Sequence, residues 1–291
     1  MMKEYLKEKR TLVDLVIEEY LDEIKYPKII AEGMKYSVLN GGKRLRPILL
    51  LMTLDLLGVQ EKNGLPMSVA IEMIHSYSLV HDDLPALDND DYRRGKFSTH
   101  KKFGEAEAIL IGDALLTHAF NLITREDLEP SKIVEMVKLT STYAGVNGMI
   151  GGQMVDVESE RKEIDLPTLQ YIHTHKTGKL LMLPIECACI IAGIEDHKKE
   201  VLKKYAELIG LAFQIKDDIL DIEGTFEEIG KPVGSDRELL KSTYPSIFGI
   251  EKTKEILIGK IEEAKQIMFD TFGDKAKWHM ELADYIGNRR K

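Results

Sequence analysis

The chain has 291 residues, of which 44% are hydrophobic and 31% are charged, and its formal net charge is −9. A chain of this length and hydrophobic content can bury a large core, which excludes intrinsic disorder, and the negative net charge argues against nucleic acid as a partner. The only two cysteines, Cys187 and Cys189, are too close for an ordinary disulfide and too few for a structural zinc site. We therefore expect buried thiols in a cytoplasmic protein.

Helical periodicity dominates the sequence. Residues 1–24 carry acidic side chains throughout, which predicts an amphipathic helix and not a signal peptide. The most apolar stretch, residues 180–194, contains Pro184 and Glu186 and is shorter than the roughly 20 residues of a membrane span, so no stable membrane insertion is predicted. Turn-forming residues separate the helical segments at Gly41-Gly42, Asn63 to Pro66, Glu129 to Ser131, Asp165 to Thr168 and Gly230 to Pro232. We predict one all-α domain over residues 1–291, with roughly ten or more helices around a central ligand cavity.

An acidic cluster ends one of the apolar helical stretches. It consists of Asp82-Asp83 followed by Asp88, with Pro85 between them. An unbroken helix would send Asp82 and Asp88 to different sides, but a proline ends or kinks a helix. We therefore expect the chain to curl back and bring Asp88 to a metal ion shared with Asp82. A calcium loop of the EF-hand type is excluded because the segment lacks the required Asx spacing and the late Glu.

A second acidic cluster, Asp217-Asp218 followed by Asp221, has regular helical spacing. Residues three and four apart share a helix face, and Gln214 lies on that face as well. Three carboxylates within about one turn repel one another unless hard cations compensate them, and Mg²⁺ prefers oxygen ligands of this kind. A solvated acidic face is the alternative, against which the preceding apolar residues argue. The two clusters together predict the walls of a Mg²⁺-dependent diphosphate site.

Basic residues occur where a diphosphate would need them. They are Lys43, Arg46, Arg93, Arg94, Lys176 and Lys231. Arginine binds phosphate oxygens bidentately and lysine supplies a point charge, although each of these residues alone could be an ordinary surface cation. His75 lies two helical turns before Asp82 on the same face and either points toward the same site or is an ordinary core side chain.

Five segments of the chain resemble the signature motifs of the trans-isoprenyl diphosphate synthases. They are GGKRLRP at 41–47, HDDLPALDNDDYRRG at 81–95, HKTGKL at 175–180, FQIKDDILDIEG at 213–224 and GKPVGSD at 230–236. The segments occur in the family's order, and the resemblance covers essentially the whole chain. It implies an all-α isoprenoid synthase fold, usually a homodimer, in which both acidic clusters face a central cavity.

The resemblance also implies a role for each motif residue. Three Mg²⁺ ions would hold an allylic diphosphate between two sets of ligands, Asp82, Asp83 and Asp88 on one side and Asp217, Asp218 and Asp221 on the other. The same diphosphate would be bound by Arg93, Lys176 and Lys231. The allylic cation would be stabilised by Thr177, Gln214 and the backbone carbonyl of Lys176. The second substrate, isopentenyl diphosphate, would be bound without metal by Lys43, Arg46, His75 and Arg94.

Product length is predicted from the helix that precedes Asp82. Tyr77 lies about 7.5 Å before Asp82 along a helix axis, at 1.5 Å per residue, and Ser78 beside it is small. An aromatic residue at this position resembles the members of the family that make the fifteen-carbon farnesyl product from dimethylallyl and geranyl diphosphate. The alternative is that Tyr77 merely packs in the core.

Other activities remain open at this point. A longer-chain synthase with a twenty-carbon geranylgeranyl product is the main rival, and a non-catalytic regulatory subunit of the same fold is a rival from another class. A terpene cyclase needs no second diphosphate site, whereas Lys43, Arg46, His75 and Arg94 supply one here. The C-terminal segment from Arg289 to Lys291 either closes over isopentenyl diphosphate or forms a solvated basic tail.

Overall fold

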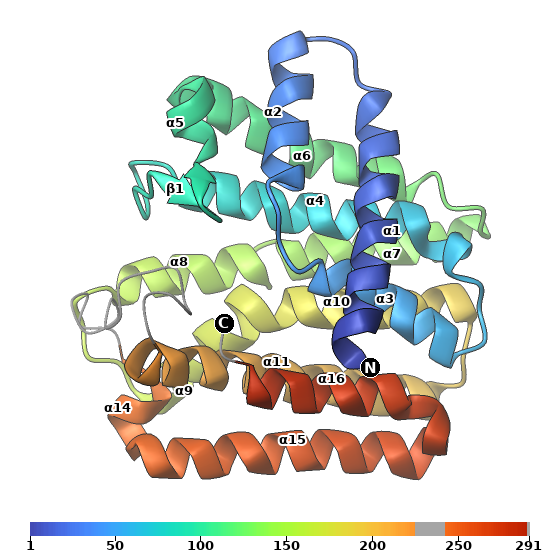
Figure 1. Cartoon of the computed structure of the whole chain (residues 1–291), viewed down its shortest axis with the longest axis vertical. Helices are drawn as coiled ribbons and strands as arrows, with labels where there is room; N and C mark the ends of the chain where they lie inside the picture. The colour runs from blue at the N-terminus through green and yellow to red at the C-terminus, as the bar shows by residue number, and fades with distance from the viewer. Residues whose placement is uncertain (225–241, 290–291) are drawn as a thin grey trace. The chain divides into compact units, whose positions relative to one another are not determined.

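A computed structural model describes residues 1–224 and 242–289 (Figure 1). These residues are mostly helical and contain two short strands, which confirms the predicted all-α class. They divide into two compact units, which are described separately. The first comprises residues 3–137 and 190–192, and the second comprises residues 138–189 and the described residues from 193 onward. The prediction of a single domain over residues 1–291 stays a prediction.

The first unit contains helices and a short hairpin. In chain order they are α1 Met2–Asp22, α2 Lys28–Leu39, α3 Leu45–Leu56, a 3₁₀ turn at Glu61–Gly64, α4 Leu65–Asp82, β1 Tyr92–Arg93, β2 Lys96–Phe97, α5 Thr99–Phe103, α6 Glu105–Ile123 and the start of α7 Pro130–Ala144. The N-terminal amphipathic helix is confirmed as α1, in which Val13 and Ile17 are fully buried and Leu15 is exposed.

Two glycines let α6 approach its neighbours α2 and α4 closely. A Cβ atom added at Gly112 of α6 would lie 2.2 Å from Nε2 of His81 on α4, and one added at Gly33 of α2 would lie 2.1 Å from a methyl group of Ile111 on α6. His81 also contacts the carbonyl oxygen of Ile109 through Nε2 at 3.1 Å. Close packing on α6 therefore fixes the C-terminal half of α4, where the first acidic cluster begins.

A buried carboxylate caps the other end of α4. Oε1 of Glu126, which is 6% exposed, accepts a hydrogen bond of 2.7 Å from the backbone N–H of Met67 in the first helical turn. That N–H has no partner inside the helix, and the helix dipole favours negative charge there. Burial nevertheless raises the pKa of Glu126 to about 7, because the hydrogen bond from Met67 offsets only part of the cost of removing the charge from water.

This raised pKa predicts a pH-dependent stability. The folded protein binds the Glu126 proton more tightly than the unfolded chain, so the contribution of Glu126 is fully present below the ordinary pKa of 4.5 and is lost as the pH rises to about 7. The rise in the pKa of Glu126 from 4.5 to about 7 corresponds to a loss of about 3 kcal/mol in the free energy of unfolding. In Glu126→Gln the amide oxygen can still accept from Met67, and no charge is buried. We expect the unfolding free energy of the variant, minus that of the wild type, to increase between pH 4.5 and 7 in denaturant titrations; a difference independent of pH would contradict the assignment.

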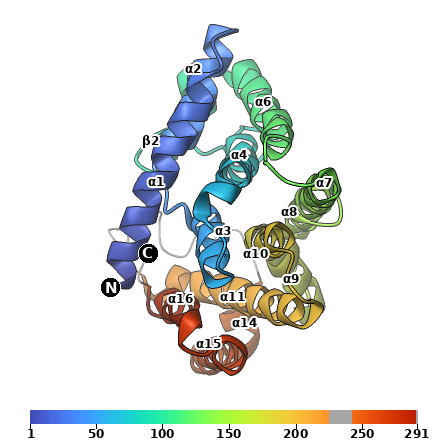
Figure 2. The same cartoon turned by 90° about the vertical axis from the view of Figure 1, so that its right-hand side faces the viewer.

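The second unit contains the remaining helices. They are the end of α7, α8 Met149–Ser159, α9 Leu166–Ile172, a π-helical turn at His173–Gly178, α10 Lys179–Ala192 except for its last three residues, α11 Asp196–Glu223, α14 Tyr244–Phe248, α15 Ile250–Phe272, a 3₁₀ turn at Gly273–Ala276 and α16 Lys277–Asn288. Helices α15 and α16 pack with α11 and lie beside it in both views (Figures 1 and 2). The hydroxyl of Tyr205 on α11 donates to the carbonyl oxygen of His279 on α16 at 2.7 Å. Cys187 and Cys189 on α10 are buried thiols, as predicted.

The predicted breaks between helices agree with the described boundaries. α2 ends before Gly41-Gly42, α7 begins at Pro130, and α9 begins after Asp165, whose side chain accepts from the N–H of Thr168 at 3.0 Å. The break at Gly230 to Pro232, with Lys231, lies outside the described residues. Within the described residues one helix, α6, is long and apolar enough to cross a membrane, a test that the core helix of a soluble protein also passes.

Candidate active site

The first acidic cluster lies where α4 ends. The helix stops at Asp82, and the chain then turns back so that the N–H of Asp88 donates to the carbonyl oxygen of Asp82 at 2.8 Å and the N–H of Asp90 donates to that of Asp83 at 3.2 Å. The predicted return of the chain around Pro85 is therefore confirmed. It brings the backbone of Asp88 next to that of Asp82, with the Asp82 side chain half-buried and Asp88 exposed.

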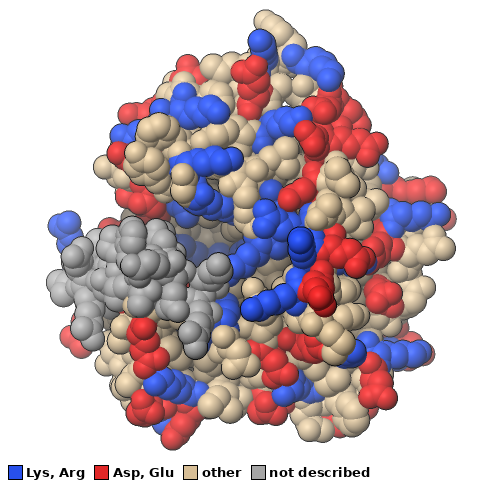
Figure 3. All heavy atoms as spheres, in the orientation of Figure 1, with Lys and Arg blue, Asp and Glu red and all other residues tan. Residues whose placement is uncertain are grey.

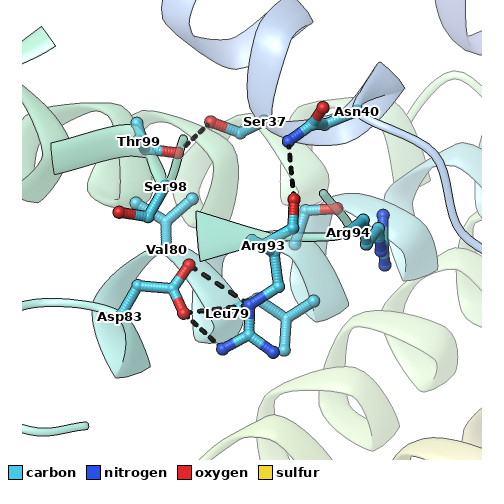
Figure 4. Close-up of a pocket in the computed structure, with 10 residues that line it drawn as sticks. Ser37, Asn40, Leu79, Val80, Asp83, Arg93, Arg94, Ser98 and Thr99 are labelled. Carbon is cyan, nitrogen blue, oxygen red and sulfur yellow. Dashed lines mark hydrogen bonds and ion pairs between the residues drawn. The ribbon is translucent and has the colours of Figure 1, made fainter. Parts of the chain in front are cut away.

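Asp83 pairs with an arginine of the same motif. Its carboxylate, which is almost completely buried, accepts from Nε of Arg93 at 2.9 Å and also from Nη2 (Figure 4). Burial raises the pKa of Asp83 above its ordinary range, although the Arg93 guanidinium lowers it. The hairpin that carries Arg93 is thereby tied to the C-terminal end of α4.

Three cationic or titratable side chains predicted for isopentenyl diphosphate lie together in the first unit. They are Arg46, His75 and Arg94. Burial lowers the pKa of Arg46 to about 10, with a further contribution from the positive charge of Arg94. Burial and the neighbouring arginines, Arg46 and Arg94 foremost, hold the pKa of His75 well below its usual value, so the imidazole is neutral at pH 7. Nε of Arg46 is buried and has no hydrogen-bond partner in the described part of the protein. These properties are those of a site that binds an anion.

The loop before α3 completes this cluster. Gly41 and Gly42 have φ angles of 100° and 118°, and Nη1 of Arg94 donates to the carbonyl oxygen of Gly41. A Cβ atom at Gly42 would lie 2.7 Å from Cζ of Arg94, so a side chain there would displace the guanidinium, and the positive φ angles favour glycine at both positions. Lys43 is exposed beside it. Several Lys and Arg side chains lie close together on the face in Figure 3.

Arg44, in the middle of the same motif, has a different role. Its side chain is 1% exposed, and it donates through Nε to Asp14 at 2.6 Å and through Nη1 to Glu72 at 2.8 Å. These ion pairs join α1, the start of α3 and α4. Within the GGKRLRP segment, Lys43 and Arg46 therefore belong to the cation cluster, and Arg44 between them joins helices of the fold.

The second acidic cluster lies near the C-terminal end of α11. Asp218 is buried and accepts from the N–H of Tyr244 at 2.8 Å, whereas Asp217 and Asp221 are half-buried. Gln214, one turn earlier, donates through Nε2 to Oδ2 of Asp217 at 3.3 Å. The regular helix predicted over these residues is confirmed.

A π-helical turn carries Lys176 and Thr177 next to α11. Single π turns inside helical segments occur frequently at functional sites. A Cβ atom at Gly152 of α8 would lie 2.1 Å from the backbone nitrogen of Lys176, and one at Gly210 of α11 would lie 3.3 Å from Cα of Gly178. The turn is therefore packed tightly between the two helices. Nζ of Lys176 pairs with Oδ2 of Asp156 at 2.6 Å.

Asp217 also pairs with the C-terminal arginine of the described chain. Nη2 of Arg289 donates to Oδ1 of Asp217 at 2.7 Å and to the carbonyl oxygen of Phe213 at 2.9 Å. Its guanidinium lies 3.8 Å above the ring of Phe213, and the side chain is 5% exposed. Arg289 thus compensates one charge of the cluster, while Arg290 and Lys291 lie outside the described residues.

Tyr77 and Ser78, predicted to set product length, are both buried on α4. The ring of Tyr77 contacts that of His81 edge to face, with centroids 5.8 Å apart. Its hydroxyl is buried and has no hydrogen-bond partner among the residues that the structure describes. A buried unpaired hydroxyl costs stability, so packing alone would favour phenylalanine. Ser78 donates to the carbonyl oxygen of His75 at 2.9 Å.

The acidic side chains fit Mg²⁺ by their chemistry. Within residues 1–224 and 242–289, no three His, Cys, Asp or Glu side chains are close enough to hold one metal ion by themselves. Mg²⁺ does not require such a cage, because it is commonly bound by one or two carboxylates together with water and substrate phosphates. Asp88 is exposed and Asp82, Asp217 and Asp221 are half-buried, and all four supply the hard oxygen ligands that this type of binding uses.

Three further side chains contact predicted site residues, and none of these three contacts was predicted. Asp156 binds Lys176, Arg289 binds Asp217, and His173 lies with Nε2 3.8 Å from Oδ1 of Asp218. Burial lowers the pKa of His173 to about 4, so its ring is neutral. The position of Asp156 shortly after Gly151-Gly152 is a sequence signal that could have indicated it. The contacts of Arg289 and His173 join segments far apart in sequence, so no local signal could have predicted them.

Comparisons with known proteins show the protein family to which the chain belongs. Residues 27–272 match the family described as polyprenyl synthetase. A farnesyl diphosphate synthase of Micrococcus luteus is 49% identical over 294 residues, covering 100% of both chains. One of Geobacillus stearothermophilus is 47% identical over 268 residues, covering 91% of this chain and 90% of the relative. The structure of an FPP/GFPP synthase from Zymomonas mobilis superposes with a TM-score of 0.87 at 34% identity, covering 98% of each chain.

The chain therefore belongs to the polyprenyl synthetase family.

Proposed function

We propose that this protein is a farnesyl diphosphate synthase, which condenses isopentenyl diphosphate with dimethylallyl diphosphate and then with geranyl diphosphate. The observation that carries the proposal is that the first unit holds an acidic cluster at Asp82 and a cluster of cations at Arg46 and Arg94, and that the second unit holds another acidic cluster at Asp217. A diphosphate that binds through metal ions needs acidic clusters, whereas a diphosphate that binds without metal needs a cluster of cations. Two of the relatives named above are farnesyl diphosphate synthases, which supports the proposal.

In the proposed reaction the two acidic clusters bind one substrate jointly, with Lys176 and Arg93 as additional cations. Bound Mg²⁺ supplies positive charge that neutralises the leaving diphosphate. The bond between C1 and oxygen of the allylic substrate breaks, and Thr177, Gln214 and the carbonyl of Lys176 stabilise the allylic cation through their oxygen dipoles. C4 of isopentenyl diphosphate then bonds to C1, and a proton is lost from C2 to the released diphosphate.

The neutral His75 and the cations Arg46 and Arg94 bind the diphosphate of the second substrate. Burial lowers the pKa of Arg46, the positive charge of Arg94 lowers it further, and a bound anion compensates both effects by stabilising the charged guanidinium. Lys43 extends the same cluster toward solvent. Lys231, which was predicted to bind the allylic diphosphate, lies outside the described residues.

The test of the proposed function is an assay with dimethylallyl and isopentenyl diphosphates, with and without Mg²⁺. We expect diphosphate release that requires Mg²⁺, and a fifteen-carbon product by chromatography. A twenty-carbon product would favour the geranylgeranyl rival. Absence of turnover by the folded protein, with each allylic substrate in turn, would favour the regulatory subunit.

We also propose a cytoplasmic homodimer, with α6 in its interface. Ile109 and Leu110 on this helix are 46% and 57% exposed, and the helix has a mean hydropathy of 1.3. An apolar face of this kind is usually covered by protein. The dimer is expected to have twice the chain's 33.0 kDa in light scattering.

Leu110→Arg is expected to reduce that mass to the value of one chain, because a guanidinium in an apolar contact loses its hydration without a partner. Ile258→Arg is the matched control, since Ile258 is equally apolar and 62% exposed on α15. A Leu110→Arg protein that keeps the mass of the dimer would place the interface elsewhere.

A further inference from the structure

The C-terminal half of α2 holds the segment that carries Arg93 and Arg94. We call residues 92–97, which form β1, the turn Arg94-Gly95 and β2, the arginine hairpin. The hydroxyl of Tyr36 donates to the carbonyl oxygen of Phe97 at 2.7 Å. Ser37 shares a hydrogen bond of 2.9 Å with Thr99 just after the hairpin, as Figure 4 shows. Asn40 adds a longer contact of 3.4 Å to the carbonyl oxygen of Arg93.

The arginine hairpin depends on such outside contacts. Each strand has two residues, and an isolated two-stranded hairpin is at best marginally stable in water. Its aromatic pair, Tyr92 and Phe97, stacks with centroids 5.0 Å apart, but both rings are more than half exposed. The hairpin therefore has little core of its own.

The two arginines differ in how they are held. Arg93 is fixed by its own ion pair with the buried Asp83. Arg94 sits at a φ angle of 56° in the turn, and its guanidinium donates to the backbone carbonyl of Gly41. The position of the hairpin backbone therefore sets the direction of the Arg94 side chain. The contacts from α2 fix that backbone position.

The contact of Tyr36 is the best defined of the three from α2. Its hydrogen bond is short, and its ring is braced by Phe103, edge to face at 5.5 Å, and by Nζ of Lys102, which lies 3.7 Å from the ring centroid. The hydroxyl cannot leave Phe97 without disturbing both neighbours. Burial raises the pKa of Tyr36, so the hydroxyl remains a donor at neutral pH.

We propose that Tyr36 is a positioning residue for isopentenyl diphosphate, because its hydroxyl fixes β2 and thereby the turn that directs Arg94 toward the anion site of Arg46 and His75. The inference rests on the proposed function. It assigns to α2 a role in substrate affinity that is separate from its packing against α6.

Tyr36→Phe tests this role, since it removes one hydroxyl group and leaves the ring in place. Loss of one hydrogen bond corresponds to a change on the order of three- to tenfold. We expect the KM for isopentenyl diphosphate to rise by that factor. The KM for the allylic diphosphate should stay within about twofold, because Arg93 keeps its ion pair with Asp83.

Tyr205→Phe is the matched control. The Tyr205 hydroxyl also donates to a backbone carbonyl oxygen at 2.7 Å, but it lies on α11 in the second unit and contacts His279. This variant should lower the melting temperature and leave both KM values unchanged. If Tyr36→Phe likewise lowers only the melting temperature, Tyr36 is a structural residue and the inference is wrong.

A double variant identifies the residue through which Tyr36 acts. In an Arg94→Ala background, Tyr36→Phe should cause no further rise in the KM for isopentenyl diphosphate. A full additional rise would show that Tyr36 acts by another route and would overturn the inference. If Arg94→Ala raises this KM and Tyr36→Phe does not, the inference fails while the proposed function stands. Absence of turnover by the wild-type protein would refute both.

Discussion

Asp217→Asn is expected to lower kcat by a factor on the order of a hundred to a thousand, the range found when one electrostatic contact to a developing charge is removed. Asn keeps the size of the side chain and an oxygen that can accept from Arg289, but it removes the negative charge that Mg²⁺ binding requires. The measurement is steady-state turnover over a range of Mg²⁺ concentrations. Manganese binding by the free protein, followed by electron paramagnetic resonance, should weaken in parallel.

Two controls separate this effect from a loss of stability. Asp270→Asn removes a carboxylate that also accepts from a glutamine one turn earlier, Gln266, on the exposed face of α15, and it should leave kcat unchanged. Arg289→Gln removes the counter-ion of Asp217 and keeps the acid. If Arg289→Gln lowers kcat as strongly as Asp217→Asn, the ion pair and not metal binding would explain the loss.

The class of fold follows from the sequence because helical periodicity and helix breaks are local properties. Pro85 illustrates this: its position between Asp82 and Asp88 predicts a chain reversal, and the N–H of Asp88 does return to the carbonyl of Asp82. The regular spacing from Asp217 to Asp221 likewise predicts the helix that α11 forms. Such features need only the sequence around them.

Partners that come from distant segments could not be predicted in the same way. Asp83 was predicted as a metal ligand, but whether its carboxylate is open or bound to Arg93 depends on where a hairpin ten residues later folds. The contact between Arg289 and Asp217 joins segments 72 residues apart. Charge alone does not distinguish Arg44, which is buried against Glu72, from Arg46, which lies in the proposed anion site. Only tertiary packing decides between these roles.

Tyr77→Ala is expected to change the main product from fifteen carbons to twenty or more. The side chain is 4% exposed and lies on α4 five residues before Asp82, which corresponds to about 7.5 Å along the helix. One isoprene unit is of similar length. Removing the ring would open space of that depth beyond the first acidic cluster, so a growing tail could extend by a further unit. The measurement is chromatography of the dephosphorylated products made from geranyl and isopentenyl diphosphates.

Stability has to be controlled in this experiment, because removing a buried aromatic side chain costs on the order of 3–5 kcal/mol. Tyr77→Phe is the matched variant. It keeps the ring against His81 and removes a hydroxyl that has no hydrogen-bond partner in the described structure, so it should retain the fifteen-carbon product without loss of stability. A folded Tyr77→Ala protein that still makes only the fifteen-carbon product would show that Tyr77 does not limit product length. A twenty-carbon product from Tyr77→Phe as well would show that the hydroxyl and not the ring limits chain growth.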